Sequence, residues 1–73
     1  MDQQKILGFV DAEPFVPFDI RTSDGRVYSV DAPDFFARSR DGRTFTYYTE
    51  DNRIVVIDME HVVAVELANR PAA

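Results

Sequence analysis

The stretches Asp24-Gly25-Arg26, Asp41-Gly42-Arg43 and Asp51-Asn52-Arg53 decide the fold of this chain. Each stands between runs rich in Val, Ile, Phe, Tyr and Thr, residue types that favour β-strands. Asp-Gly favours a tight reversal because glycine adopts a positive φ without steric cost, and asparagine also tolerates that region. Three such reversals close together predict a meander of antiparallel strands.

A short helix is expected before the first strand. Asp2 is a candidate N-cap for a helix over residues 3–10, whose narrow apolar stripe contains Ile6 and Val10. Pro14 and Pro17 prevent continuation of the helix, and the segment 14–22 is expected to contain the lead-in and the first strand.

The remaining elements follow from the reversals. Strands are expected over residues 26–31, 35–39, 43–49, 53–58 and 62–67, with a break at 32–34 and one tight helical turn at 59–61. The predicted fold class is therefore mainly β with a minor α component. It consists of a short N-terminal helix followed by a strongly bent, five- to six-stranded antiparallel meander that forms a small partial barrel.

The chain is short for a self-sufficient core. Its 73 residues allow one domain, predicted over residues 1–68 with a flexible tail at 69–73. A domain of this size buries only about 60% of the surface that its unfolded chain exposes. The sequence has no cysteine and one histidine, His61, so disulfides, thiolate–zinc sites and a histidine-rich metal site are excluded. Self-association is the expected additional support, and no cofactor or metal is predicted.

The charge of the chain narrows the classes of partner. A formal net charge of −5 disfavours a general affinity for nucleic acid or for an anionic membrane surface. No stretch approaches the length of a membrane span, and the N-terminal residues do not resemble a signal peptide. We therefore expect a cytoplasmic protein without a membrane partner.

Apolar doublets interrupt the alternation that a sheet with one solvated face would show. They are Phe35-Phe36, Tyr47-Tyr48, Ile54 to Ile57 and Val62-Val63. Each doublet places apolar surface on both faces of the sheet, more than one short helix covers. The predicted core is Phe15, Phe18, Ile20, Val30, Phe45, Val56, Val63 and Val65; the predicted interface is Phe36, Tyr48 and Val55.

One segment is a candidate for contacts with nucleic acid. Arg38, Arg40 and Arg43 can hold phosphates, and Tyr48, which follows them, can stack on an unpaired base. The alternative is that the arginines solubilise a hairpin and pair with neighbouring acids. The net acidity of the chain favours this alternative.

Neither the histidine nor the acidic pairs predict a reactive site. His61 beside Glu60 and Asp58 is a candidate general base, but no serine stands at a recognisable spacing from it and no nucleophile elbow is present. The acidic pairs lack the graded spacing of a calcium loop. A surface histidine in a tight turn is the favoured interpretation.

Several short motifs stand at characteristic spacings. They are Pro14-Phe15-x-Pro17-Phe18-x-Ile20, Asp24-Gly25-Arg26, Pro33-x-Phe35, Gly42-Arg43, Ile57-Asp58 and Val63-x-Val65-Glu66. Together they resemble a family of small bacterial proteins that has no assigned biochemical role. The resemblance implies a short N-terminal helix followed by a β-meander over about residues 4–67.

The order of elements also resembles the Sm-like barrel, whose bacterial members include the RNA chaperone Hfq; a generic SH3-like barrel is the alternative. The resemblance implies assembly into rings by edge-strand pairing and, in many members, RNA binding. Met59-Glu60-His61 stands where Hfq has Tyr-Lys-His, so an acid replaces the lysine. This departure argues against uridine binding in the manner of Hfq.

The sequence thus predicts a non-enzymatic small β-barrel interaction module that acts as a homo-oligomer. The alternative is an Sm-like ring that binds RNA or single-stranded nucleic acid through Arg38, Arg40 and Arg43. An enzyme would need a pocket with two or more ionisable groups of strongly shifted pKa, and no pair of residues is a candidate.

Overall fold

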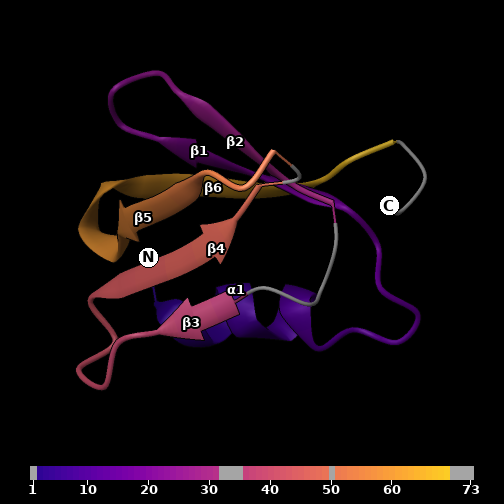
Figure 1. The fold of residues 1–73 in the computed structure, drawn as a ribbon, viewed down its shortest axis with the longest axis horizontal. Helices are drawn as coiled ribbons and strands as arrows, with labels where there is room; N and C mark the ends of the chain where they lie inside the picture. The colour runs from indigo at the N-terminus through magenta and orange to yellow at the C-terminus, as the bar shows by residue number, and fades with distance from the viewer. Residues whose placement is uncertain (1, 32–35, 50, 70–73) are drawn as a thin grey trace.

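The structure is a computed structural model that describes residues 2–31, 36–49 and 51–69. It is mainly β, with a short N-terminal helix and two antiparallel three-stranded sheets (Figure 1). In chain order the elements are α1 (Gln3–Val10), β1 (Phe18–Thr22), β2 (Val27–Val30), β3 (Phe36–Arg38), β4 (Thr44–Tyr48), β5 (Ile54–Asp58), the 3₁₀ turn η1 (Met59–His61) and β6 (Val62–Leu67). The predicted fold class is confirmed. The predicted break at 32–34 and most of the predicted tail lie outside the described residues.

The strands are divided between two sheets rather than joined in one continuous meander. The β1 sheet has the order β2-β1-β6, and the β4 sheet has the order β3-β4-β5. β6 returns antiparallel to β1 and places Val65 opposite Ile20. The last strand therefore pairs within its own chain, on one of its two edges, a point that the sequence left open.

Helix α1 connects the two sheets. Asp2 caps it as predicted, because its Oδ1 accepts a hydrogen bond from the Gln4 backbone N–H at 2.9 Å. Ile6 is fully buried, and the Phe9 ring lies 5.4 Å from the ring of Phe18 in the β1 sheet. On the other side, Gln3 Nε2 donates to the Thr44 carbonyl in the β4 sheet at 2.9 Å.

The three reversals share one hydrogen bond, which a hydroxyl two residues before the aspartate donates to its carboxylate. In the reversal between β3 and β4, Ser39 Oγ donates to Asp41 Oδ1 at 2.7 Å, and Asp41 Oδ1 also accepts from the Arg43 backbone N–H at 3.0 Å. Thr22 and Thr49 donate in the same way to Asp24 and Asp51. The residue after each aspartate has a positive φ, as predicted: 85° at Gly25, 75° at Gly42 and 66° at Asn52.

These hydrogen bonds stabilise the ionised form of each turn aspartate. The hydroxyl two residues earlier is the largest cause that lowers the pKa of Asp24, Asp41 and Asp51 below the ordinary 3.8. The aspartates and the residues after them predict the reversals from the sequence, whereas the role of the preceding hydroxyl residues is evident only in the structure. The complete turn motif is therefore a Ser or Thr, any residue, Asp, Gly or Asn, and Arg.

The core lies between the two sheets and under α1. Its buried members are Ile6, Phe18, Ile20, Val30, Phe45, Tyr47, Ile57, Met59 and Val62. The predicted core residues Phe18, Ile20, Val30 and Phe45 are confirmed, and Phe15 and Val65 pack against the core while partly buried.

The core prediction is wrong for two residues. Val56 and Val63 are each 61% exposed, whereas their neighbours Val55 and Val62 face inward. On β5, Ile57 stands opposite the buried Phe45 and Val55 opposite the buried Tyr47, so alternation turns Val56 outward. On β6, the pairing register with β1 shifts between Arg21 and Thr22, and Val62 turns inward beside Thr22.

Candidate functional site

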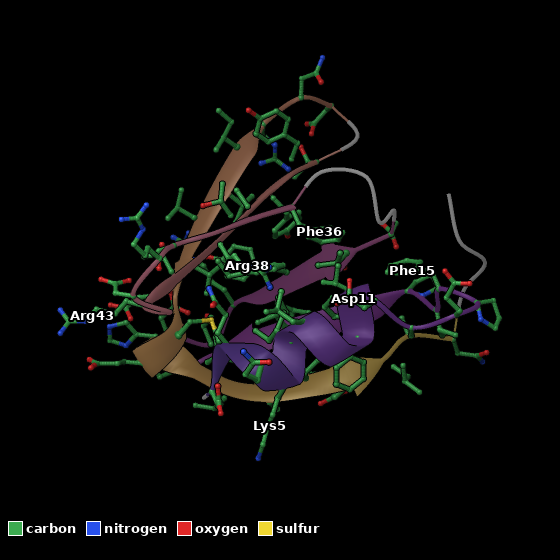
Figure 2. The ribbon with its side chains drawn as sticks, turned by 90° about the horizontal axis from the view of Figure 1, so that it is seen from below. Lys5, Asp11, Phe15, Phe36, Arg38 and Arg43 are labelled. Carbon is green, nitrogen blue, oxygen red and sulfur yellow. The ribbon has the colours of Figure 1, made fainter. Side chains whose placement is uncertain are left out.

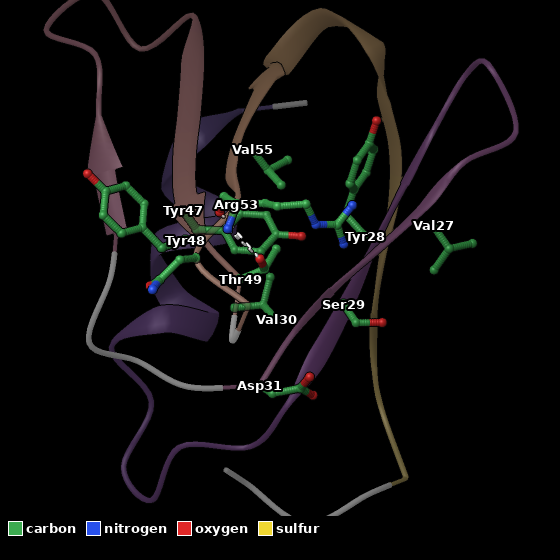
Figure 3. Close-up of a pocket in the computed structure, with 11 residues that line it drawn as sticks. Val27, Tyr28, Ser29, Val30, Asp31, Tyr47, Tyr48, Thr49, Arg53 and Val55 are labelled. Atoms are coloured by element: carbon green, nitrogen blue, oxygen red, sulfur yellow. Dashed lines mark hydrogen bonds between the residues drawn. The ribbon is translucent and has the colours of Figure 1, made fainter.

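A cleft opens between the β1 sheet and the β4–β5 hairpin (Figure 3). Its volume is about 580 Å³, and its lining includes Tyr28 and Val30 of β2, Tyr47 of β4, and Arg53 and Val55 at the start of β5. Volumes of this size are typical of small-ligand and side-chain pockets. The lining combines valine side chains and hydroxyl groups with the Asn52 amide, the Asp31 carboxylate and the Arg53 guanidinium.

Tyr47 forms the buried wall of this cleft. Burial, reinforced by Tyr28 and Asp31, raises the pKa of Tyr47 to about 12. Its hydroxyl is therefore neutral over the physiological range and available as a hydrogen-bond donor. A neutral phenol at a valine-lined wall suits the binding of a ligand with both apolar and hydrogen-bonding groups.

Arg53 stands at the mouth of the cleft. Its Nε lies 3.1 Å from Asp51 Oδ2, and its side chain remains 74% exposed. Figure 3 shows the Arg53 side chain extended across the cleft toward Tyr28. The guanidinium has more N–H donors than one carboxylate uses, so it can also donate to a second anionic group.

Four strands, β2, β3, β5 and β6, have one edge that no described strand covers. Along β5, Met59 N donates to Arg43 O at 2.8 Å and Thr49 N donates to Arg53 O at 2.8 Å. Because antiparallel bonds alternate, the backbone groups of Ile54 and Val56 point away from β4. On β6, Ala68 N donates to Pro17 O at 2.8 Å. By the same alternation, the backbone groups of Val65 and Leu67 point away from β1.

Another open edge belongs to β2. Thr22 N donates to Arg26 O at 3.1 Å, so alternation pairs Ile20 with Tyr28 and turns the backbone groups of Val27 and Ser29 away from β1. Both residues line the cleft. This edge therefore has a hollow beside it, and Arg53 and Val55 at the start of β5 line the same hollow.

The predicted nucleic-acid residues are only partly brought together. Arg38 and Arg40 line a hollow of about 490 Å³ with Gln3, Gln4 and Leu7 of α1. Arg43 is not part of this lining; it lies 3.9 Å from Asp41 and projects from the far end of its turn (Figure 2).

Tyr48 and Arg38 lie on opposite faces of the β4 sheet. Arg38 stands opposite the buried Phe45, whereas Tyr48 stands opposite the exposed Ile54. Of the predicted interface residues, Phe36 and Val55 face inward and pack against the core while partly buried. Tyr48, which is 49% exposed, is the one on the outer face.

The histidine has a neighbour that sequence spacing did not indicate. Ser23 Oγ lies 3.2 Å from His61 Nδ1, and His61 Nε2 lies 4.0 Å from Asp58 Oδ2. The Ser23 backbone N–H donates to the His61 carbonyl at 2.7 Å, which ties the β1–β2 turn to η1. The His61 and Asp58 side chains are both largely exposed, so we interpret the contact as a brace between two turns.

Among the residues that the structure describes, no three or more His, Asp or Glu side chains are grouped as metal ligands would be. No helix in the described ranges is both long and apolar enough to cross a membrane.

Comparisons with known proteins add one structural neighbour. No protein-family model matches the sequence, and no curated protein matches it. Among solved structures, the chain is similar to a Northeast Structural Genomics Consortium target determined by X-ray crystallography. The TM-score is 0.56 and the sequence identity 25%, over 75% of this chain and 96% of that chain. The likeness supports the small β-rich fold.

Proposed function

We propose that this protein is a non-enzymatic interaction module that assembles with copies of itself by pairing open strand edges. The observation that carries the proposal is that β5 is an edge strand with exposed apolar side chains. Its residues Ile54 and Val56 are 62% and 61% exposed, and their backbone groups point away from β4. The run 54–57 contains no charge or proline. Natural edge strands usually carry such residues, which prevent unwanted pairing.

The partner that we propose for β5 is β6 of a second copy. β6 also has one open edge, and its Val63 and Leu67 are 61% and 64% exposed. Pairing β5 with β6 would cover the exposed valines, isoleucine and leucine of both strands. Pairing β5 with β5 would leave Val63 and Leu67 in water. The β5–β6 pairing is head-to-tail, and such contacts close into rings when the rotation between copies permits.

The element order is consistent with this assembly. α1 precedes the strands, η1 immediately precedes β6, and β6 pairs with β1. We assign this order to the Sm-like topology, in which edge strands of neighbouring subunits pair. The assignment is part of the proposal and stands or falls with the oligomeric state.

Light scattering on a size-exclusion column tests the assembly. We expect a mass of several chains for the unmodified protein and a shift toward monomer for Val56→Lys, because a lysine on the edge must be desolvated on pairing. Thr46→Lys is the matched control: Thr46 lies directly opposite Val56 on the same outer face but on the central strand. A monomeric unmodified protein at high concentration would contradict the proposal.

A mixing experiment tests the head-to-tail geometry. Val56→Lys disables β5, and Leu67→Lys disables β6. We expect neither variant to assemble alone, whereas an equal mixture should form a one-to-one heterodimer through the intact β6 of the first and the intact β5 of the second. Self-association of Leu67→Lys alone would instead indicate a symmetric β5–β5 contact.

Binding of single-stranded nucleic acid is the second candidate function. The supporting observation is that Arg38 and Arg40 share one hollow at the start of α1. The Asp2 carboxylate already caps that helix end and would repel a phosphate. Fluorescence anisotropy of a labelled oligonucleotide at low salt should show binding that Arg38→Ala weakens and Arg43→Ala does not. Absence of binding at low salt would remove this candidate.

A further inference from the structure

We propose that the open edge of β2, together with the cleft beside it, binds an extended peptide segment of another protein by strand addition. The edge is the first requirement. Val27 and Ser29 present their backbone N–H and C=O groups away from β1, at the mouth of the cleft. An added strand gains its affinity from these main-chain groups and its specificity from pockets for alternate side chains.

The cleft specifies which side chains the peptide would carry. A strand paired with β2 places every second side chain on the same face as Tyr28 and Val30. On that face the peptide would meet Val30, Val55 and the buried Tyr47. The hollow of about 580 Å³ has room for at least one large apolar side chain there.

Arg53 adds a charge preference. Its exposed guanidinium extends toward Tyr28 in Figure 3, so a cleft-facing carboxylate beside Tyr28 would pair with it. Tyr28 and Val30 are two residues apart on the same face of β2. The expected ligand is therefore an extended segment that carries an acidic residue and an apolar residue two positions apart.

The backbone edge that would bind the peptide differs from the two edges proposed for self-association, although Val55 of β5 also lines the cleft. Assembly uses the outward edges of β5 and β6, whereas the peptide would use the edge of β2 in the other part of the β1 sheet. In this chain Val56 and Asp58 of β5 also have the required spacing, but the proposed self-association assigns the β5 edge to β6 of a second copy. We therefore propose a segment of another protein as the occupant of the cleft.

The test uses two short labelled peptides of alternating threonine that differ at one position. One carries a leucine and, two residues away, a glutamate; the other has glutamine in place of the glutamate. We expect anisotropy to show tighter binding of the glutamate peptide, by about twofold to fivefold as for an exposed ion pair. Arg53→Gln should remove this difference. Amide shifts in nuclear magnetic resonance spectra should be centred on Val27 and Ser29.

Ser29→Pro tests the edge itself. It removes an outward N–H while leaving the bonds between β1 and β2 in place, and proline is tolerated at such positions. We expect loss of binding of both peptides with unchanged amide signals in α1 and β5. If this variant fails to fold, the peptide pair with Arg53→Gln still decides the question.

Several results would overturn the proposal. They are shifts centred on β5 or β6, equal binding of both peptides to the unmodified protein, or unchanged binding to a folded Ser29→Pro variant. A fall in oligomeric mass of Ser29→Pro without added peptide would show that a second copy occupies this edge. Val56→Lys should retain peptide binding even as a monomer, which separates failure of this proposal from failure of the assembly proposal.

Discussion

The two sheets have similar inner faces and different outer faces. The outer face of the β1 sheet is mostly polar: Asp19, Ser29 and Glu66 lie on it with the exposed Val27, and Arg21 Nε contacts Glu66 Oε1 at 2.7 Å. The outer face of the β4 sheet carries Thr46 and the exposed Tyr48, Ile54 and Val56. The outer face of the β1 sheet is thus mostly polar away from β6, whereas the outer face of the β4 sheet carries several apolar side chains that extend to the open edge of β5. This difference motivates the assignment of assembly to β5.

The largest expected effect tests the equivalence of the inner faces. Phe45 and Phe18 are both fully buried, one in each sheet. Replacement of either by alanine should lower the free energy of unfolding by about 3–5 kcal/mol, because it removes a buried ring and leaves a cavity. Thr46→Ala, on the outer face, should change it by no more than about 0.5 kcal/mol. Urea titrations followed by circular dichroism measure the free energy of unfolding of all three variants. A large decrease for Thr46→Ala would contradict the assignment of faces.

The next effect tests the difference between the outer faces. If copies pair through β5, association stabilises the folded state and the thermal midpoint rises with protein concentration. Ile54→Lys should abolish that concentration dependence. A lysine at Ala37, on the same outer face but on β3, should preserve it, as should Arg21→Lys on the β1 sheet. Scanning calorimetry over a tenfold range of concentration checks this, and a flat response in the unmodified protein would contradict pairing.

The turn aspartates predict that the free energy of unfolding depends on pH, with a larger contribution from the turns of the β4 sheet. Asp41 and Asp51 reverse its two hairpins, and Asp24 reverses the single hairpin of the β1 sheet. The pKa of each is lowered on folding, first by the hydroxyl of Ser39, Thr49 or Thr22. Their stabilising contribution is therefore present above the ordinary carboxyl pKa of 3.8 and is lost as the pH falls through the lowered values.

Chemical denaturation at pH 6.5 and pH 3 measures this contribution. We expect the double variant Asp41→Asn/Asp51→Asn to be less stable than the unmodified protein at the higher pH, with a smaller difference at the lower pH. Asp24→Asn should show the same trend with a smaller amplitude. An equal difference at both pH values would show that ionisation of the turns contributes nothing.

The smallest effect concerns the ion pair on the β1 sheet. Arg21 and Glu66 are each about half exposed, so their contact should contribute about 0.2–1 kcal/mol and weaken with added salt. Arg21→Ala should leave the oligomeric mass unchanged, because the pair stands on the face that we assign to water. A change in mass would extend the interface from the edge of β6 onto the outer face of the β1 sheet.

Sequence patterns located most of the elements because their causes are local. The predicted helix over 3–10 and the helical turn at 59–61 have the observed bounds, and the strands differ at their ends by about one residue. Asp2 was identified as the cap from its type and position alone. The same local chemistry predicted the positive φ at Gly25, Gly42 and Asn52.

Assignment of faces failed where alternation was ambiguous. In the run 54–57 all four residues are apolar, so the pattern could not separate Val55 from Val56. The Phe45–Ile57 pairing decides between them. The sequence also did not predict three features: the cleft, the Ser23–His61 contact and the placement of Tyr48 and Arg38 on opposite faces. Each of them depends on how strands that are distant in the sequence are arranged.

The sequence alone determined where the chain reverses and which segments are extended, because glycine, asparagine and a carboxylate act on the backbone within a few residues. Only the tertiary structure decided which edges remain open and which valines face water. Those outcomes depend on strand register and on the closure of β6 against β1, and both are set by packing between segments that lie far apart in the chain.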